Sequence, residues 1–312
     1  MSTKQREVET LYSQTGTGTD VLKDPDVAHL TVNHNKVLTS HTLEGLEIDV
    51  KEIEDGIDVE LVLRRGVTID KTVHMCFGMT PREGIQRINM KVRLEENSAI
   101  SVLAHCVFPN AVDVEHIMDA EIEVGAGARY SYLEKHVHGK TGGIKVYPKA
   151  KIHLAQKSAF KTEFELLRGR VGLIDIEYET TCEARSVMDV TARINGIETD
   201  FIKINEIGHL VGEHARGALT SKIAISDKAR AEIYNTLTAS AAHARGHVDC
   251  KEIVRGEATA MAVPTVRVNH PRAHVTHEAA IGSVDTKQLE TLMSRGLDED
   301  EASDLIIQGM LS

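Results

Sequence analysis

The segment Asn97-Ser98-Ala99-Ile100-Ser101-Val102 joins a turn residue, small side chains and alternating apolar positions within six residues. The same pattern returns about 30 residues later in Gly125-Ala126-Gly127-Ala128-Arg129-Tyr130, and again in residues 149–154, 228–233 and 256–261. Small residues suit corners where successive coils pack closely, and short repeated strands bury their apolar faces only against neighbouring copies. The repeat therefore predicts a stacked β-solenoid.

Alternating apolar and polar residues support this prediction from about residue 30 to residue 283. Ile88-Asn89-Met90-Lys91-Val92-Arg93-Leu94 is one such run, and others occupy residues 46–50, 59–63, 122–124, 152–154, 174–176, 223–225 and 229–233. Alternation over such short lengths predicts strands. A β-sandwich would also contain many short strands, but with clearer hairpin signals and more aromatic residues than the 4% found here. The pattern favours a mainly β fold of the β-helix type over a sandwich.

The two ends of the chain differ from this middle. Residues 4–12 are polar with two apolar positions three apart, which predicts a short helix, and the Gly-Thr run at 15–19 then ends it. We therefore divide the chain into an N-terminal helix and linker (1–29), a β-helix core (30–283) and a C-terminal helical region (284–312).

The C-terminal region predicts two helices joined as a hairpin. Asp285 and Asp298 are N-cap candidates, each followed three residues later by Gln or Glu. The apolar positions that follow at helical spacing are Leu289, Leu292, Leu305 and Ile306. They can close the open end of the solenoid or form a docking surface for a partner, and both interpretations can hold.

Composition excludes several classes of protein. The 312 residues carry a formal charge of -11, which argues against a general nucleic-acid binder. The N-terminus lacks the apolar segment of a signal peptide, and no apolar run is long enough to span a membrane. Four scattered cysteines without a CxxC pair predict reduced thiols in the cytoplasm.

Candidate ligating residues gather near the end of the solenoid. Cys250 alternates with Val248 on one strand face, whereas His277 and Glu278 are adjacent and must point to opposite faces of a regular strand. Cys250 can be a small buried hydrophobe, or the cationic residues near it can favour a reactive thiolate. A site that uses both His277 and Glu278 needs a bent strand or two subunits.

Two enzyme classes remain as alternatives. Seven histidines fall between His209 and His277, which allows a histidine-based zinc or iron enzyme, although their spacing matches no standard zinc motif. A β-helix can also act on polysaccharides through acidic residues in a groove, but the scarcity of aromatic residues counts against sugar stacking.

The C-terminal motifs resemble those of a known family. The segments Gly246-His247-Val248-Asp249-Cys250-Lys251, Val275-Thr276-His277-Glu278-Ala279-Ala280-Ile281-Gly282 and Gln288–Leu297, with Glu301-Ala302 and Ile306-Ile307-Gln308-Gly309, resemble the SufB/SufD family of the SUF iron–sulfur cluster assembly system. The resemblance implies a right-handed parallel β-helix with a C-terminal helical hairpin that docks SufC, an ABC-type ATPase.

The same resemblance implies a function and its residues. The chain would be a scaffold without enzymatic turnover, on which a transient iron–sulfur cluster, expected to be of the [4Fe-4S] type, forms at a subunit interface. Cys250 would ligate iron or receive sulfur, Glu278 would be a second ligand, and His277 would be supplied from across the interface. The implied partners are the SufC-like ATPase, a second copy or a SufD-like subunit, a sulfur donor and recipient apoproteins, with no nucleotide bound by the chain itself. Cys76, Cys106 and Cys182 match no motif of the family, which leaves a sulfur path through the β-helix open.

Overall fold

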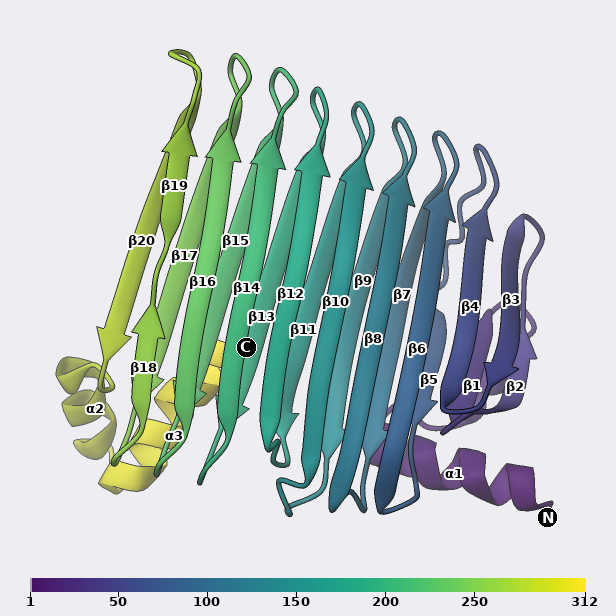
Figure 1. The fold of residues 1–312 in the computed structure, drawn as a ribbon. Helices are drawn as coiled ribbons and strands as arrows, with labels where there is room; N and C mark the ends of the chain where they lie inside the picture. The colour runs from purple at the N-terminus through teal and green to yellow at the C-terminus, as the bar shows by residue number, and fades with distance from the viewer. Residues whose placement is uncertain (1) are drawn as a thin grey trace.

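The computed structural model describes residues 2–312 and is built almost entirely from two parallel sheets that face each other (Figure 1). Successive strands alternate between the sheets, so that each coil contributes one strand to each, and about 8 turns stack along the axis. Sheet A contains, in spatial order, β2 (Lys36–His41), β1 (His29–Asn33), β5 (Val73–Gly78), β7 (Ala99–Phe108), β9 (Arg129–His138), β11 (Ala159–Arg168), β13 (Val187–Gly196), β15 (Arg216–Ile225), β17 (Arg245–Val254) and β20 (His274–Gly282). Sheet B contains β18 (Thr259–Ala262), β16 (Arg230–Ala239), β14 (Phe201–Leu210), β12 (Leu173–Cys182), β10 (Ile144–Leu154), β8 (Asp113–Val124), β6 (Glu83–Leu94), β4 (Gly56–Leu63) and β3 (Leu46–Ile53), with β19 (Thr265–Val268) beside β16.

The sheet topology confirms the predicted β-solenoid and excludes the sandwich. Strands within each sheet pair in parallel from β4 and β5 onward, whereas a sandwich is built from antiparallel strands. Among the described residues, the antiparallel pairs lie at the N-terminal end and join β1 with β2 and β3 with β4. These pairs close the first coil, which has no preceding coil to cover it.

The core lies between the sheets and follows from the alternation in the sequence. In β14, for example, Ile202, Ile204 and Leu210 point inward and are fully buried, whereas Lys203, Asn205 and His209 point outward and are half-exposed. Valine, isoleucine and leucine dominate this core, as the low aromatic content requires. Several strands are longer than predicted because inward-facing polar residues, such as His116 in β8 and Glu134 in β9, interrupt the apolar alternation.

A column of left-handed residues makes most of the corners between a sheet B strand and the next sheet A strand. Asn97 (φ 58°), Gly127 (φ 69°) and Lys157 (φ 61°) occupy equivalent places in three successive coils. The buried small residues Ser98, Ala128 and Ser158 follow them. A left-handed residue turns the chain sharply, and a small side chain lets the next coil approach, which explains the repeated sequence pattern.

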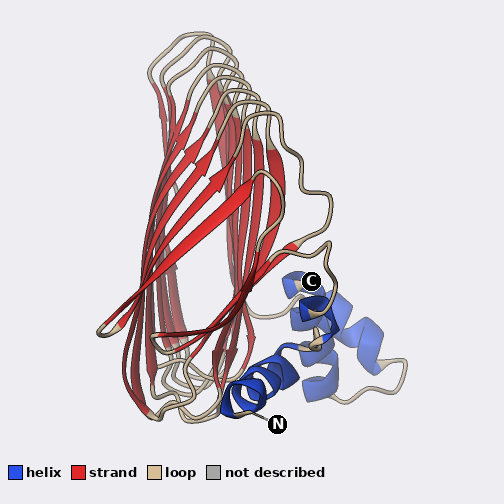
Figure 2. Cartoon of the chain, turned by 90° about the vertical axis from the view of Figure 1, so that its right-hand side faces the viewer, coloured by secondary structure: helices blue, strands red, loops and turns tan. Residues whose placement is uncertain are grey.

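Three α-helices lie outside the solenoid on the side of sheet A (Figure 2). Helix α1 (Thr3–Thr15) buries Leu11 and Tyr12 against the outer face of β5 and β7, and a short 3-10 helix, η1 (Asp20–Leu22), follows. Helices α2 (Thr286–Met293) and α3 (Glu299–Leu311) form the predicted hairpin and are capped by Asp285 and Asp298, as the sequence predicts. Across residues 2–312, the helices are too short or too polar to cross a lipid bilayer.

Candidate functional site

Cys250 lies inside the solenoid, in the last coil but one. It occupies β17 between Val248 and Glu252 on the inward face, and its side chain has no solvent exposure. On β15, the residue paired with Cys250 is Ser221, which is also buried. The predicted alternation of Cys250 with Val248 is therefore correct.

Buried polar side chains surround this thiol. The Asn235 amide donates a hydrogen bond to Cys250 Sγ at 3.8 Å, and the Ser221 hydroxyl donates to Glu252 Oε1 at 3.3 Å. Glu206 on β14 is the sheet neighbour of Asn235 and is equally buried. Two carboxyl groups, an amide and a hydroxyl therefore lie close to the thiol on the inward faces of neighbouring strands.

Burial favours the uncharged forms of the thiol and the two carboxyl groups. Desolvation raises the pKa of Cys250 to about 11, and the nearby Glu252 and Glu206 add to the rise. Desolvation also raises the pKa of Glu252 to about 7 and that of Glu206 to about 8. The thiol form of Cys250 therefore prevails at neutral pH.

The cationic residues near Cys250 in sequence do not reach it. Lys251 faces outward and pairs with Asp249 at 3.0 Å, while Arg255 pairs with Asp300 and Asp304 of α3, each at 2.7 Å. The interpretation that neighbouring cations favour the thiolate is wrong for this conformation, because strand alternation and the contacts of α3 direct those charges away. Of the two interpretations, the buried cysteine is the one found.

His277 and Glu278 lie on β20, the final strand of sheet A, and both are exposed. Register pairs His277 with Val248 and Glu278 with Asp249, so His277 shares the inward face with Cys250 and Glu278 lies on the outer face. The predicted opposite orientation of these two residues is confirmed. Within one chain, Cys250 therefore shares a face with His277 and not with Glu278, which is the reverse of the arrangement that the family resemblance implies.

The remaining histidines of the 209–277 group are dispersed. His209 pairs with Glu179 at 3.1 Å, His214 stacks on His243 at a ring-centroid distance of 4.8 Å, and His247 shares a 2.8 Å hydrogen bond with Thr276. Over residues 2–312, no three of them come close enough to hold one metal ion.

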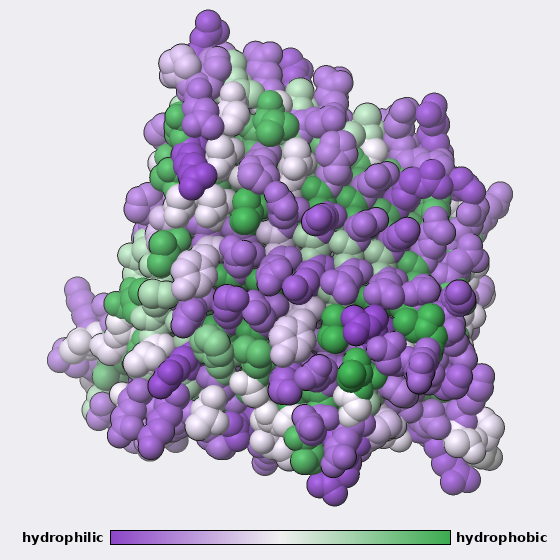
Figure 3. All heavy atoms as spheres, viewed as in Figure 1, coloured by the Kyte–Doolittle hydropathy of each residue, from purple (hydrophilic) through white to green (hydrophobic). Residues whose placement is uncertain are grey.

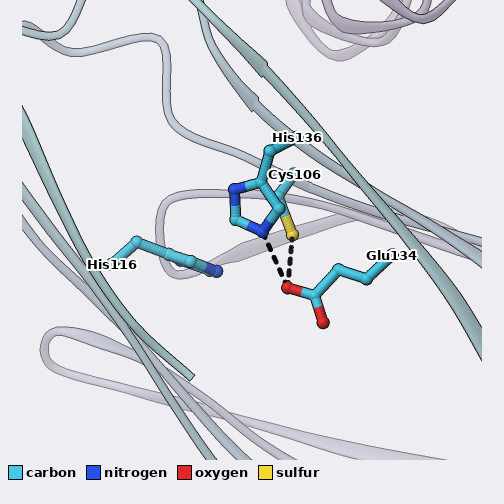
Figure 4. A group of neighbouring side chains, drawn as sticks. All are labelled: Cys106, His116, Glu134 and His136. Atoms are coloured by element: carbon cyan, nitrogen blue, oxygen red, sulfur yellow. Dashed lines mark hydrogen bonds and ion pairs between the residues drawn. The ribbon is translucent and has the colours of Figure 1, made fainter. Parts of the chain in front are cut away.

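A buried cluster that the sequence prediction missed lies in the middle of the solenoid (Figure 4). It brings together Cys106, His116, Glu134 and His136, with one donor atom of each within 4.8 Å of the others. Two sequence signals point to it. Glu134, His136 and His138 alternate along one strand face, and Cys106 precedes His136 by one coil of 30 residues.

The last coil exposes apolar side chains. Met261, Val263, Val268 and Ile281 are each more than 40% exposed, and Figure 3 shows apolar atoms along the edge where β18 to β20 lie. On the helical hairpin, Leu305 is 47% exposed, and Leu289, Leu292 and Ile306 are half-buried. The C-terminal end therefore offers more uncovered apolar surface than a closed solenoid end requires.

This architecture defines a class of β-solenoid proteins with thiol, imidazole and carboxyl groups inside the core and an open last coil. The family model described as "SUF system FeS cluster assembly, SufBD core domain" matches residues 78–310. The chain belongs to this SufBD family of iron–sulfur cluster assembly proteins, as the motifs at its C-terminal end indicated.

Archaeal relatives support the assignment over nearly the whole chain. An iron-sulfur cluster assembly SufBD family protein of Methanocaldococcus jannaschii is 38% identical over 90% of this chain and 89% of its own length. One of Pyrococcus horikoshii is 30% identical over 96% of this chain and 91% of its own. A third, of Archaeoglobus fulgidus, is 28% identical over 79% of this chain and 66% of its own.

Proposed function

We propose that this protein is a scaffold subunit on which an iron–sulfur cluster is assembled and from which it is transferred, without enzymatic turnover of its own. The cluster is cargo held between two subunits, either two copies of this chain or this chain and a related one. A sulfur donor and recipient apoproteins complete the cycle. The cytoplasm is the proposed location, which agrees with four cysteines that are all free thiols.

The observation that carries this proposal is the register of the last two strands of sheet A. It puts Cys250 on β17 and His277 on β20 on the same inward face, and β20 has no further sheet neighbour within residues 2–312. Thiolate and imidazole are ligands that iron accepts. The outward Glu278 can reach a shared cluster from the opposite subunit, so two chains supply what one strand cannot.

The helical hairpin is the proposed docking site for a SufC-like ABC ATPase. Leu289, Leu292, Leu305 and Ile306 provide its apolar contacts. Only three residues separate β20 from α2, so a force on the hairpin is transmitted directly to the strand that carries His277 and Glu278. Because Cys250 is sealed as a neutral thiol, cluster assembly requires this strand to move, and nucleotide-driven motion of a docked ATPase can supply that movement.

Anaerobic reconstitution tests the cluster site. Wild type, Cys250→Ala and Cys182→Ala are incubated with ferrous iron and a sulfide source, and cluster absorbance and acid-labile sulfide are measured. We expect a cluster in wild type and Cys182→Ala, and at least a fivefold loss in Cys250→Ala. Equal cluster content in all three proteins would refute the role of Cys250. Cys182 is the matched control because it is also a fully buried cysteine of the solenoid core.

Co-purification tests the docking site separately. A tagged full-length chain and a chain lacking residues 285–312 are each expressed with the ATPase subunit. We expect the ATPase to be retained by the full chain alone. A paired substitution of Leu305→Asp and Ile306→Asp in the full chain should abolish retention while leaving the circular dichroism of the solenoid unchanged. Retention by either altered chain would place the docking surface elsewhere.

A further inference from the structure

The buried cluster in the middle of the solenoid has the composition of a metal centre and lies outside the site discussed above. Cys106 comes from β7, His116 from β8, and Glu134 and His136 from β9 (Figure 4). All four side chains are at most 2% exposed. Four strand spacings of about 4.8 Å separate β9 from β17, so this cluster lies about 19 Å from the strand of Cys250.

The three strands hold the donors in fixed positions. Cys106 and His136 are direct partners in the β7–β9 ladder, and Glu134 precedes His136 by two residues on the same inward face. His116 approaches from the facing sheet. Each of these strands has hydrogen-bonded neighbours on both sides, so the donors are set by backbone pairing.

A chain of hydrogen bonds fixes the tautomer of His136. The carbonyl oxygen of Arg170 can only accept, so His138 Nδ1 donates to it at 3.1 Å. In a neutral ring, His138 Nε2 then accepts from His136 Nδ1, also at 3.1 Å. His136 Nε2 is left with its lone pair directed into the cluster, 2.7 Å from Glu134 Oε1. Metal-binding histidines are oriented by their second nitrogen in this way.

Two members of the cluster have unsatisfied polar atoms. Neither ring nitrogen of His116, nor Glu134 Oε2, has a hydrogen-bond partner within residues 2–312. Leaving a buried polar group unpaired costs about 1–3 kcal/mol. Phe108 lies 4.9 Å from the His116 ring and Phe164 lies 4.6 Å from the His136 ring, so apolar walls surround these atoms. Unpaired buried nitrogen and oxygen atoms close to a thiol indicate that a bound ion is missing from this cluster.

We propose that Cys106, His116, Glu134 and His136 bind one divalent transition-metal ion, of the Zn²⁺ or Fe²⁺ type, in a closed four-ligand site. One thiolate, one carboxylate and two imidazoles are a donor set that these ions accept. Binding displaces one proton from the thiol and one from the carboxyl group, so two negative ligands balance the two positive charges of the ion. The buried site is electrically neutral both before and after binding, which avoids the penalty for an isolated charge.

The geometry needs a modest contraction. Tetrahedral bonds of about 2.0–2.3 Å put donor atoms about 3.3–3.7 Å apart, whereas the present donors are within 4.8 Å of one another. Glu134 must exchange its hydrogen bond to His136 for the ion, and a cavity of about 20 Å³ beside Glu134 gives the carboxylate room to move. Four protein ligands leave no open position for water or substrate, so the ion braces the two sheets and takes no part in chemistry.

Cobalt substitution tests the site in the full-length chain. Cys250→Ala is used as the background, so that a metal bound at the proposed cluster site does not contribute. The protein is expressed in minimal medium with Co²⁺, which lets the ion enter during folding, and is purified anaerobically. We expect one Co²⁺ per chain, a thiolate-to-cobalt charge-transfer band and visible bands of tetrahedral intensity. Absence of bound Co²⁺, or bound Co²⁺ without the thiolate band, would overturn the proposal.

Variants assign the ligands and separate binding from folding. Cys106→Ser should lose the thiolate band, and Cys182→Ser should retain it. His116→Phe should lower the bound metal at least tenfold yet leave the melting temperature of the metal-free protein unchanged or higher, because an unpaired polar ring is replaced by an apolar one. A band that persists in Cys106→Ser, or metal content in His116→Phe equal to that of the background, would refute the assignment. Since the background already lacks Cys250, these outcomes are independent of the iron–sulfur scaffold proposal.

Discussion

Glu206 is a carboxyl group buried in the core, and its titration should make folding stability depend on pH. Its inward neighbours in sheet B are Tyr178 and Asn235, it is 1% exposed, and its Oε2 has no hydrogen-bond partner in the described part of the chain. Burial raises its pKa from 4.5 to about 8. Between these two values the folded protein holds a proton that the unfolded chain has released, so folding stability falls as pH rises. At 1.36 kcal/mol per unit, the loss is about 5 kcal/mol.

Glu206→Gln removes this titration and keeps the shape of the side chain. We expect the variant and wild type to melt at similar temperatures near pH 4.5, and the variant to be more stable by about 5 kcal/mol above pH 8. For a chain of 312 residues this corresponds to roughly 7 °C in Tm. The assay is differential scanning calorimetry from pH 4.5 to 9, and Glu121→Gln, on the exposed face of β8, is the control. A Tm difference between Glu206→Gln and wild type that does not change with pH would refute the reasoning.

Burial lowers the pKa of His105 to about 4. The contribution of neutral His105 to folding stability is therefore present above pH 6.5 and is lost as pH falls toward 4. In urea titrations, His105→Gln should weaken this acid destabilisation by on the order of 2–3 kcal/mol. Asp298→Ala removes the capping box of α3 and should cost about 1 kcal/mol locally, seen as faster amide hydrogen exchange in α3 but not in β9. Cys250 lies beside the terminal strand β20, whereas Cys106 lies on a strand with neighbours on both sides, so Cys250 should be alkylated at least tenfold faster. Peptide mass spectrometry of partly labelled protein measures the two rates. Equal rates would contradict the assignment of β20 as the mobile strand.

The solenoid could be predicted because its determinants are local. Each corner needs a residue that tolerates positive φ followed by a small one, and Asn97-Ser98 and Gly127-Ala128 show this requirement in the sequence itself. Strand lengths could not be predicted as well. Where His116 or Glu134 points inward, the apolar alternation ends although the strand continues, because parallel neighbours on both sides hold the backbone.

The candidate site was only partly predictable. Side chains alternate between the two faces of a strand, which alone predicts that His277 and Glu278 point in opposite directions, and the strand register confirms this. The burial of Cys250 and the outward pairing of Arg255 with α3 depend on contacts between distant segments, which neighbouring residues in the sequence do not reveal. Likewise, a coil length of 30 residues relates Cys106 to His136, but the approach of His116 from the other sheet is a property of sheet packing.

The positions of the two interior polar clusters suggest why one chain would need both. Opening β9 breaks backbone ladders on two sides, whereas β20 has a single partner strand, so the free energy of local opening must be lower at the C-terminal end. A group that is loaded and released, as cargo is, needs ligands such as Cys250 that a small movement can uncover. An ion that stabilises the coils against that same movement needs ligands such as Cys106, which stay buried when the C-terminal strand moves. The difference in opening energy along a single solenoid can therefore separate an exchanging site from a permanent one without a second domain.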